Sequence, residues 1–277
     1  MIRFRTMTRL DLDTVLHWAE AEGWAPGLDD ARAFLAADPA GFVLAQSDAE
    51  GPVAALAVVN HSAGFATVGL HLCRPEWRGR GIGLALWRHA LPHAGGRSLG
   101  LIAPAPLEQV YARSGFETVG GTLRLSGMLE ARDDPAIRPA GPADQASLVM
   151  LDAQAIGYAR PGFLGAWLAG AEGRHTVVLG PPGQPSGFAT IRVSRSGARI
   201  GPVVAPGAGA ALRLIRAACA RMPGVPVSLD LPQTSRALAE ALTDAGLEPG
   251  AKAVQMIKGR APLATAMQQA IATPELG

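Results

Sequence analysis

The 277-residue chain is poor in cysteine, aromatic residues and charge, and each shortage excludes a class of protein. Its two cysteines, Cys73 and Cys219, lie far apart in apolar runs, which argues against a disulfide framework or a metal site. The net charge of +2 is too small for nucleic acid or a membrane to be the main partner. No apolar stretch approaches the roughly 20 residues that span a membrane, and the N-terminal stretch MIRFRTMTRLDLD carries charges where a signal peptide needs an apolar core. We therefore expect a cytoplasmic protein without a metal, in which any positive site is local.

Short segments recur at a nearly constant offset along the chain, which indicates two copies of one unit. Residues 43–59 resemble 178–194 at an offset of 135, and residues 111–117 resemble 242–248 at an offset of 131. The matches follow each other in the same order in both copies. We expect the polar, Pro-containing stretch at 131–136 to join the copies.

The first unit has the hydrophobic pattern of an α/β domain. Its predicted order, β-α-α-β-β-β-α-β-α-β, indicates a mixed sheet flanked by helices. The sequence thus predicts two tandem domains, at 1–130 and 136–260, and a helical or frayed tail at 261–277. Strands are expected at Ile2–Arg5, Gly41–Gln46, Val53–Val59, Ala66–Cys73, Ser98–Ala103 and Thr118–Leu125, and helices around Leu12–Ala19 and at Asp29–Ala37, Gly83–Leu91 and Leu107–Ser114.

Glycines and arginines are concentrated in one loop, RPEWRGRGIG, between Arg74 and Gly83. Pro75 ends the preceding strand, and the glycines allow the backbone to approach a ligand closely. The loop leads into the N-terminus of a helix, where free N–H groups favour a phosphate or pyrophosphate. The P-loop and Rossmann patterns are both absent. The alternative to phosphate binding is a glycine-rich helix entry with solvated arginines.

Two motifs of the first unit resemble the GNAT N-acetyltransferase superfamily. The spacing Arg78-x-x-Gly81-x-Gly83 is similar to the family's acetyl-CoA signature after its fourth strand, and Tyr111-Ala-Arg-Ser-Gly115-Phe116 resembles the family's Y-x-x-x-G-F. Residues 22–42 further resemble a tandem-GNAT subgroup with a degenerate C-terminal domain. The resemblance implies two tandem GNAT-like domains and direct transfer of an acetyl group from acetyl-CoA to a small amine.

The resemblance also assigns residues to the binding of acetyl-CoA. Backbone N–H groups of the loop would hold the pyrophosphate, and the amide of Leu72 or Cys73 would stabilise the oxyanion on a strand that splays from its neighbour. The Cys73 side chain is expected to belong to the core. The residues implied for acetyl-CoA binding are Leu72, Cys73, Arg78, Gly79, Arg80, Gly81, Ile82 and Gly83.

Proton transfer and acceptor binding are assigned in the same way. The resemblance makes Tyr111 the general acid for the leaving thiolate, although an isolated Tyr on a helix commonly serves only packing. His71 is the candidate general base, with a water molecule as an equal alternative. Trp24 and Tyr158 occupy equivalent turns that line the acceptor site in the family, and Trp24 could instead be a Trp at the edge of the core.

The second unit lacks the residues that carry the chemistry of the first. Its loop at Gly207 is shorter and has no arginine, and Leu242 occupies the position that corresponds to Tyr111. We therefore expect it to bind no acetyl-CoA productively, and to pair with the first unit in a monomer or a homodimer. Two other readings remain: a non-catalytic acyl-CoA sensor, and transfer of another acyl group such as succinyl. The carboxylates nearest the acceptor turn, Glu20, Glu22, Asp29 and Asp30, hint at a cationic amine, while the helix dipole also explains Asp29 and Asp30.

Overall fold

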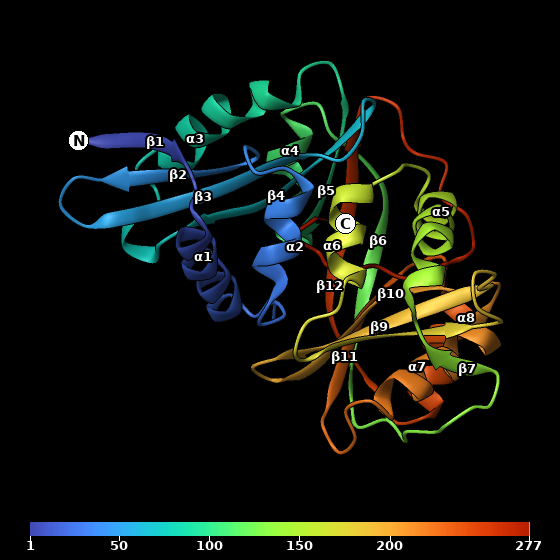
Figure 1. Ribbon diagram of the computed structural model, residues 1–277. Helices are drawn as coiled ribbons and strands as arrows, with labels where there is room; N and C mark the ends of the chain where they lie inside the picture. Colours follow the sequence, from blue (N-terminus) through green and yellow to red (C-terminus); the bar gives the residue numbers. More distant parts are fainter. Residues whose placement is uncertain (277) are drawn as a thin grey trace.

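The computed structural model describes residues 1–276, and both halves of the chain contribute strands to one continuous 13-stranded sheet (Figure 1). The first half contains β1 (Ile2–Thr6), α1 (Arg9–Ala21), α2 (Asp30–Ala37), β2 (Phe42–Ser47), β3 (Gly51–Asn60), β4 (Phe65–Cys73), α3 (Ile82–Ala90), β5 (Ser98–Pro104), α4 (Glu108–Ala112) and β6 (Glu117–Gly127). The second half contains β7 (Ile137–Pro139), α5 (Gln145–Ile156), α6 (Pro161–Leu168), β8 (Arg174–Leu179), β9 (Gly187–Ser194), β10 (Gly197–Val204), α7 (Ala208–Cys219), β11 (Val227–Pro232), α8 (Arg236–Asp244), β12 (Glu248–Lys258) and β13 (Gln268–Ala270). Short 3₁₀ helices lie at Pro75–Trp77, Leu91–Ala94, Ala105–Leu107 and Pro142–Asp144.

The order of elements repeats from β1 to β6 and again from β7 to β12, which confirms the two copies inferred from the sequence. The predicted mixed sheet with flanking helices is also confirmed, and the observed strand ends lie within two residues of the predicted ones in the first half. The helix predicted at Leu107–Ser114 is shorter than expected. A 3₁₀ turn precedes it, because Pro104 and Pro106 interrupt the backbone there.

The last strand of each half pairs with the other half. The strand order is β1-β2-β3-β4-β5-β12-β6-β11-β10-β9-β8-β7, so that β12 lies between β5 and β6. β12 pairs antiparallel with both of these strands, and β6 pairs antiparallel with β11. The exchange covers the sheet edges that β5 and β11 would otherwise leave open. The boundaries at 1–130 and 136–260 follow the order of the chain and stay a prediction, since the strand exchange joins the two halves.

Helices cover both faces of the sheet (Figure 1). In the first half, α3 and α4 pack on one face, and α1 and α2 pack on the other. In the second half, α7 and α8 occupy one face, and α5 lies on the other. Helix α6 packs against α2, so that one hydrophobic cluster contains Phe34 of the first half together with Phe163 and Trp167 of the second. The halves therefore share a core.

A buried carboxylate links the halves beside this shared core. Asp30, at the start of α2, accepts hydrogen bonds from Arg174 Nη2 at 2.6 Å and from Arg192 Nε at 3.0 Å. All three side chains are at least 96% buried. The helix start explains why Asp30 lies there, and the arginines of β8 and β9 explain why its charge is tolerated in the interior.

The C-terminal segment differs from the frayed or helical tail that the sequence predicted. It contains β13, which pairs with β10, and its last described residues are buried against the first half. A Cβ atom at Gly69 of β4 would overlap the backbone oxygen of Glu275, so the segment packs directly on this strand. The apolar residues Ala270, Ile271, Ala272 and Leu276 are buried by strands that lie far away in the sequence, so no local pattern indicates their burial.

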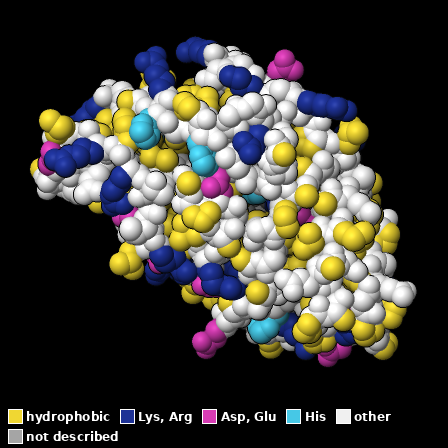
Figure 2. All heavy atoms as spheres, turned by 45° about the horizontal axis from the view of Figure 1, so that its top comes forward, with side chains coloured by type: hydrophobic (Ala, Val, Ile, Leu, Met, Phe, Trp, Pro, Cys, Tyr) yellow, Lys and Arg dark blue, Asp and Glu magenta, His cyan; other side chains and the backbone are white. Residues whose placement is uncertain are grey.

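The surface carries its charges in small groups. Figure 2 shows Lys and Arg side chains scattered over this face, several of them beside acidic side chains. Among residues 1–276, no helix has the length and apolar character needed to cross a membrane.

Candidate active site between β4 and β5

Strands β4 and β5 separate halfway along their length. They pair in parallel from Phe65 and Ser98 to Val68 and Leu101, and the pairing ends there. Directly after this point, Leu70 adopts a positive φ of 47°, and the register of β4 against β3 shifts. This bulge bends β4 away from β5 and opens a gap between the two strands.

The register identifies the backbone groups that face this gap. The N–H of Arg74 donates to Val53 O at 3.0 Å, so the next pair along, Cys73 and Ala54, is not hydrogen-bonded. The N–H of Cys73 therefore points away from β3, and that of Leu72 points toward it. Of the two amides predicted to face a thioester, the register favours Cys73. Burial raises the pKa of the Cys73 thiol, which argues against a nucleophilic role.

The glycine-rich loop continues from β4 to the start of α3. Gly79 and Gly81 have φ values of 75° and 77°, and a Cβ atom at either would meet no atom within 4 Å. Gly81 is also the N-cap of α3, so the first N–H groups of the helix face the same open space. Both glycines are required by the backbone conformation, and the space in front of them is available to a ligand.

The arginines of the loop have separate roles in the structure. Arg78 donates from Nε to Cys73 O at 2.9 Å and forms an ion pair with Glu22, so it fastens the loop to the end of α1. The guanidinium of Arg80 lies 4.7 Å from the ring centroid of Trp77. A phosphate-binding role for Arg78 stays a prediction, and Arg80 is the side chain better placed to offer its charge.

The two predicted catalytic side chains lie in contact. His71 Nδ1 is 3.3 Å from the Tyr111 hydroxyl, and His71 Nε2 is 3.3 Å from Gly83 O (part of the glycine-rich loop). Because a carbonyl oxygen can only accept, Nε2 carries the proton and Nδ1 accepts from Tyr111. The bulge at Leu70 gives His71 this position, because it turns the side chain toward α3 and α4.

Burial keeps both of these side chains uncharged near neutral pH. It raises the pKa of Tyr111 to about 12 and lowers the pKa of His71, whose contact with Gly83 opposes the shift. Tyr111 therefore holds its proton and can donate it. His71 is a neutral ring whose Nδ1 accepts the hydrogen bond of the Tyr111 hydroxyl, so it can orient that hydroxyl and can take up a proton from it.

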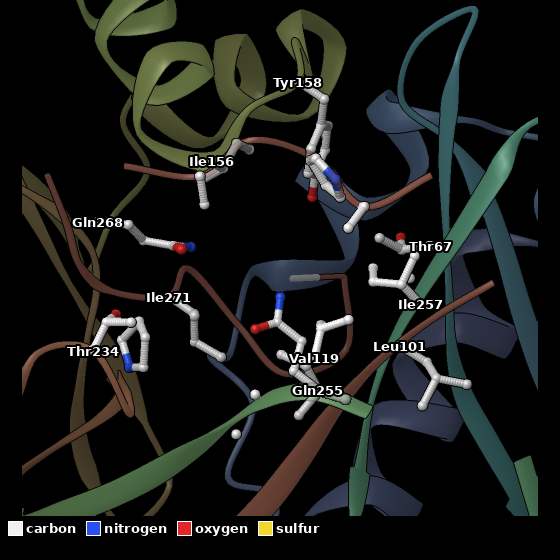
Figure 3. Close-up of a pocket in the computed structure, with 18 of the residues that line it drawn as sticks. Thr67, Leu101, Val119, Ile156, Tyr158, Thr234, Gln255, Ile257, Gln268 and Ile271 are labelled. Carbon is white, nitrogen blue, oxygen red and sulfur yellow. The ribbon is translucent and has the colours of Figure 1, made fainter. Parts of the chain in front are cut away.

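A cavity of about 830 Å³ lies between the halves, on the far side of the β4–β5 separation (Figure 3). It begins where the pairing of β4 and β5 ends, at Val68 and Leu101, and extends across β12 and β6 to the C-terminal segment. Its lining includes the tail residues 261–266 and 274–276. No pattern in the sequence indicates this cavity, because the strand exchange and the path of the C-terminal segment create it.

The two predicted acceptor residues do not share this cavity. Tyr158 lines it. The centroid of its ring lies 4.3 Å from the ring centroid of Phe65 and 5.7 Å from that of His61. Trp24 does not line it and packs against the shared core, so its role as an acceptor contact stays a prediction. The turn that holds Trp24 is fixed by Arg124, whose Nη1 donates to Gly23 O at 3.0 Å.

The carboxylates near the acceptor turn do not form an acidic pocket. Each has an arginine partner: Glu20 pairs with Arg195, Glu22 with Arg78, Asp29 with Arg9 and Arg32, and Asp30 with Arg174 and Arg192. Their charges are thus used within the protein. Within residues 1–276, no three His, Cys, Asp or Glu side chains are grouped so that they could hold a metal ion.

Comparison with known proteins identifies the family of the chain. Residues 148–272 match the family model of the acetyltransferase (GNAT) domain. The chain is 34% identical over 269 residues to the holothin acyltransferase of Pseudoalteromonas sp. (strain SANK 73390), which covers 95% of this chain and 90% of that protein. Its fold resembles that of a putative acetyltransferase from Pyrococcus horikoshii, with 18% identity, a TM-score of 0.82 and coverage of 100% and 96% of the two chains. A tandem GNAT protein from the clavulanic acid biosynthesis pathway gives 18% identity, a TM-score of 0.62 and coverage of 94% and 100%.

The match to the family model falls in the second half of the chain, whereas the two sequence motifs lie in the first half. Each half is therefore similar to a GNAT domain. The match to the acyltransferase extends over almost the whole of both proteins. The chain belongs to the GNAT superfamily of acyltransferases.

Proposed function

We propose that the protein transfers an acetyl group, or a related acyl group, from its coenzyme A thioester to the amine of a small molecule, with the chemistry confined to the first half. The observation that carries this proposal is the contact of His71 with Tyr111 at the β4–β5 gap, beside a glycine-rich helix start. The holothin acyltransferase relative supports a small-molecule acceptor.

The residues present fit a coenzyme A thioester, which would supply the activated acyl group. Gly79 and Gly81 leave room for a pyrophosphate at the N-terminus of α3, and Arg80 adds positive charge. The N–H of Cys73 would donate to the oxygen that becomes negative during transfer. Tyr111 would turn its single hydroxyl proton from His71 Nδ1 to the departing thiolate. The proton that the attacking amine loses would then restore the phenol, so that the thiol leaves with one proton and the amide forms with one fewer than the amine.

Calorimetric titration of acetyl-CoA into the full chain tests the binding half of this proposal. We expect one site per chain, lost or weakened at least tenfold in an Arg80→Glu variant. Arg80 is preferable to Arg78 for this test, because a carboxylate at position 78 would face Glu22 and distort the loop. Arg221→Glu, on the exposed surface of the second half, is the matched control and should bind as the wild type does.

Release of free thiol then tests turnover with a panel of amines and with acetyl-, succinyl- and octanoyl-CoA. Release with one acyl group and an amine supports transfer and identifies the donor. Binding of acetyl-CoA without release for any pair would favour the acyl-CoA sensor. Two sites per chain would contradict the assignment of the chemistry to the first half, and no binding would overturn the proposal.

A further inference from the structure

We propose that the cavity between the halves is the acceptor site and that Gln255 and Gln268 select an uncharged acceptor that bears amide-like hydrogen-bonding groups. This inference rests on the proposed acyl transfer and adds the chemical class of the acceptor. It concerns residues that lie outside both sequence motifs, on strands contributed by the second half of the chain.

The two glutamines face each other across the cavity. Gln255 projects from β12 and Gln268 from β13 on the opposite side, and both amides point into the space between them (Figure 3). In the described part of the chain, no protein group forms a hydrogen bond with either side-chain amide, although both residues are half-buried. Each amide offers a donor and an acceptor, so the pair can hold a carbonyl and an N–H of one ligand.

The remaining walls are mainly apolar. They include the side chains of Phe65, Val119, Ile156, Ile257 and Ile271. Small-molecule sites commonly combine such apolar walls with a few convergent polar groups, and their usual volume of about 300–1,000 Å³ includes this cavity. A flat, partly apolar molecule with two or three polar atoms would match this lining.

The charges around the cavity do not favour a cationic ligand. Two residues of the lining carry an ionisable group that is wholly or partly charged near neutral pH, Arg236 and Glu275. Arg236 is exposed, whereas Glu275 is 1% exposed. Burial and the nearby Asp30 raise the pKa of Glu275 to about 7, opposed by Arg199 and Arg192. Glu275 is therefore only partly ionised near neutral pH, so an ammonium group in the cavity would lose its hydration in exchange for at most part of one carboxylate charge.

The same amides argue against a long acyl chain as the occupant. An alkyl chain that filled the cavity would remove water from Gln255 and Gln268 and leave their donors and acceptors unpaired. A ligand with amide-like groups would satisfy them. The cavity begins at the end of the β4–β5 pairing, so an acceptor held there would meet the gap on the side opposite α3.

Two probes of nearly equal size test the proposed selectivity: 4-aminobenzamide, which is uncharged, and 4-aminobenzylamine, which is cationic. Calorimetric titration into the full chain should show tighter binding of 4-aminobenzamide. Gln255→Leu and Gln268→Leu should each weaken its binding about fivefold, the effect of losing one hydrogen bond. Gln255→Glu should reverse the preference in favour of 4-aminobenzylamine.

Controls separate this inference from the proposed function. Acetyl-CoA affinity, measured on the same variants, should equal that of the wild type, and Gln154→Leu, on the exposed side of α5, should change neither ligand. If the wild type binds no acetyl-CoA, the proposed acyl transfer is overturned. The titration of the two probes would still test the selectivity of the cavity. Stronger binding of the cation than of the amide by the wild type, or no binding of the amide, would overturn the assignment of the cavity.

Discussion

Replacing Glu275 with Gln should change how the stability of the protein depends on pH. This carboxyl lies in the C-terminal segment with Oε1 unpaired, while the Thr273 hydroxyl donates to Oε2. Burial and the negative charge of Asp30 raise its pKa from 4.5 to about 7, and Arg199 and Arg192 limit the rise. Arg124 is a further charged group within its field. Glutamine has nearly the same shape and cannot titrate.

The magnitude follows from the difference between the folded and unfolded pKa values. Because the folded state keeps this proton up to a higher pH, the free energy of unfolding falls as the pH rises from 4.5 to 7. At 1.36 kcal/mol per pH unit, the complete loss is about 3 kcal/mol, of which about 2–3 kcal/mol falls between pH 5 and pH 8. The Gln variant should lack this loss, so its stability relative to the wild type should increase with pH.

Urea unfolding at pH 5, 6, 7 and 8 measures this difference. The control is Glu240→Gln, which makes the same chemical change on the exposed surface of α8. A difference between wild type and Glu275→Gln that stays constant from pH 5 to pH 8 would refute the reasoning. It would mean that Arg192 and Arg199 hold the carboxylate ionised, and the Gln variant would then be less stable at every pH.

Two further predictions concern the site and the tail. Tyr111→Phe keeps the ring in the core but removes the proton donor, so kcat should fall about 10²–10³-fold with unchanged acetyl-CoA affinity; an unchanged kcat in the thiol-release measurement would reduce Tyr111 to packing. Gly69→Ala should destabilise the protein by about 1–3 kcal/mol in urea unfolding, because its Cβ would overlap the backbone oxygen of Glu275. Gly64→Ala, whose Cβ would meet no atom within 4 Å, should have little effect, and equal effects of the two changes would contradict the packing of the tail on β4.

The sequence predicted the elements that carry the candidate site where local signals were strong. Strand β4 followed by Pro75, the glycines at 79 and 81, and Tyr111 before Gly115-Phe116 form short patterns, whose structure depends on neighbouring residues. The assignment of His71 came from its place on β4. Its contact with Tyr111, 40 positions away, required the bulge at Leu70, for which the sequence carries no clear pattern.

The acidic residues near the acceptor turn show the opposite case. From the sequence, Glu20, Glu22, Asp29 and Asp30 hinted at a site for a cation. Their arginine partners include Arg174, Arg192 and Arg195, which lie more than 140 positions further along the chain. Local sequence therefore indicated where carboxylates gather, but the second half decided whether their charge was free.

The repeat, the order of the elements, the glycine-rich helix start and the family can all be inferred from the amino-acid sequence, because periodicity and short motifs encode local structure. The pairing of the strands cannot be inferred in this way. The exchange of β6 and β12 and the burial of residues 268–276 bring together backbone segments from both halves, and the cavity with Gln255 and Gln268 exists because of these pairings. Such contacts depend on the summed burial of distant apolar surfaces and on open sheet edges, which no short window of the sequence contains.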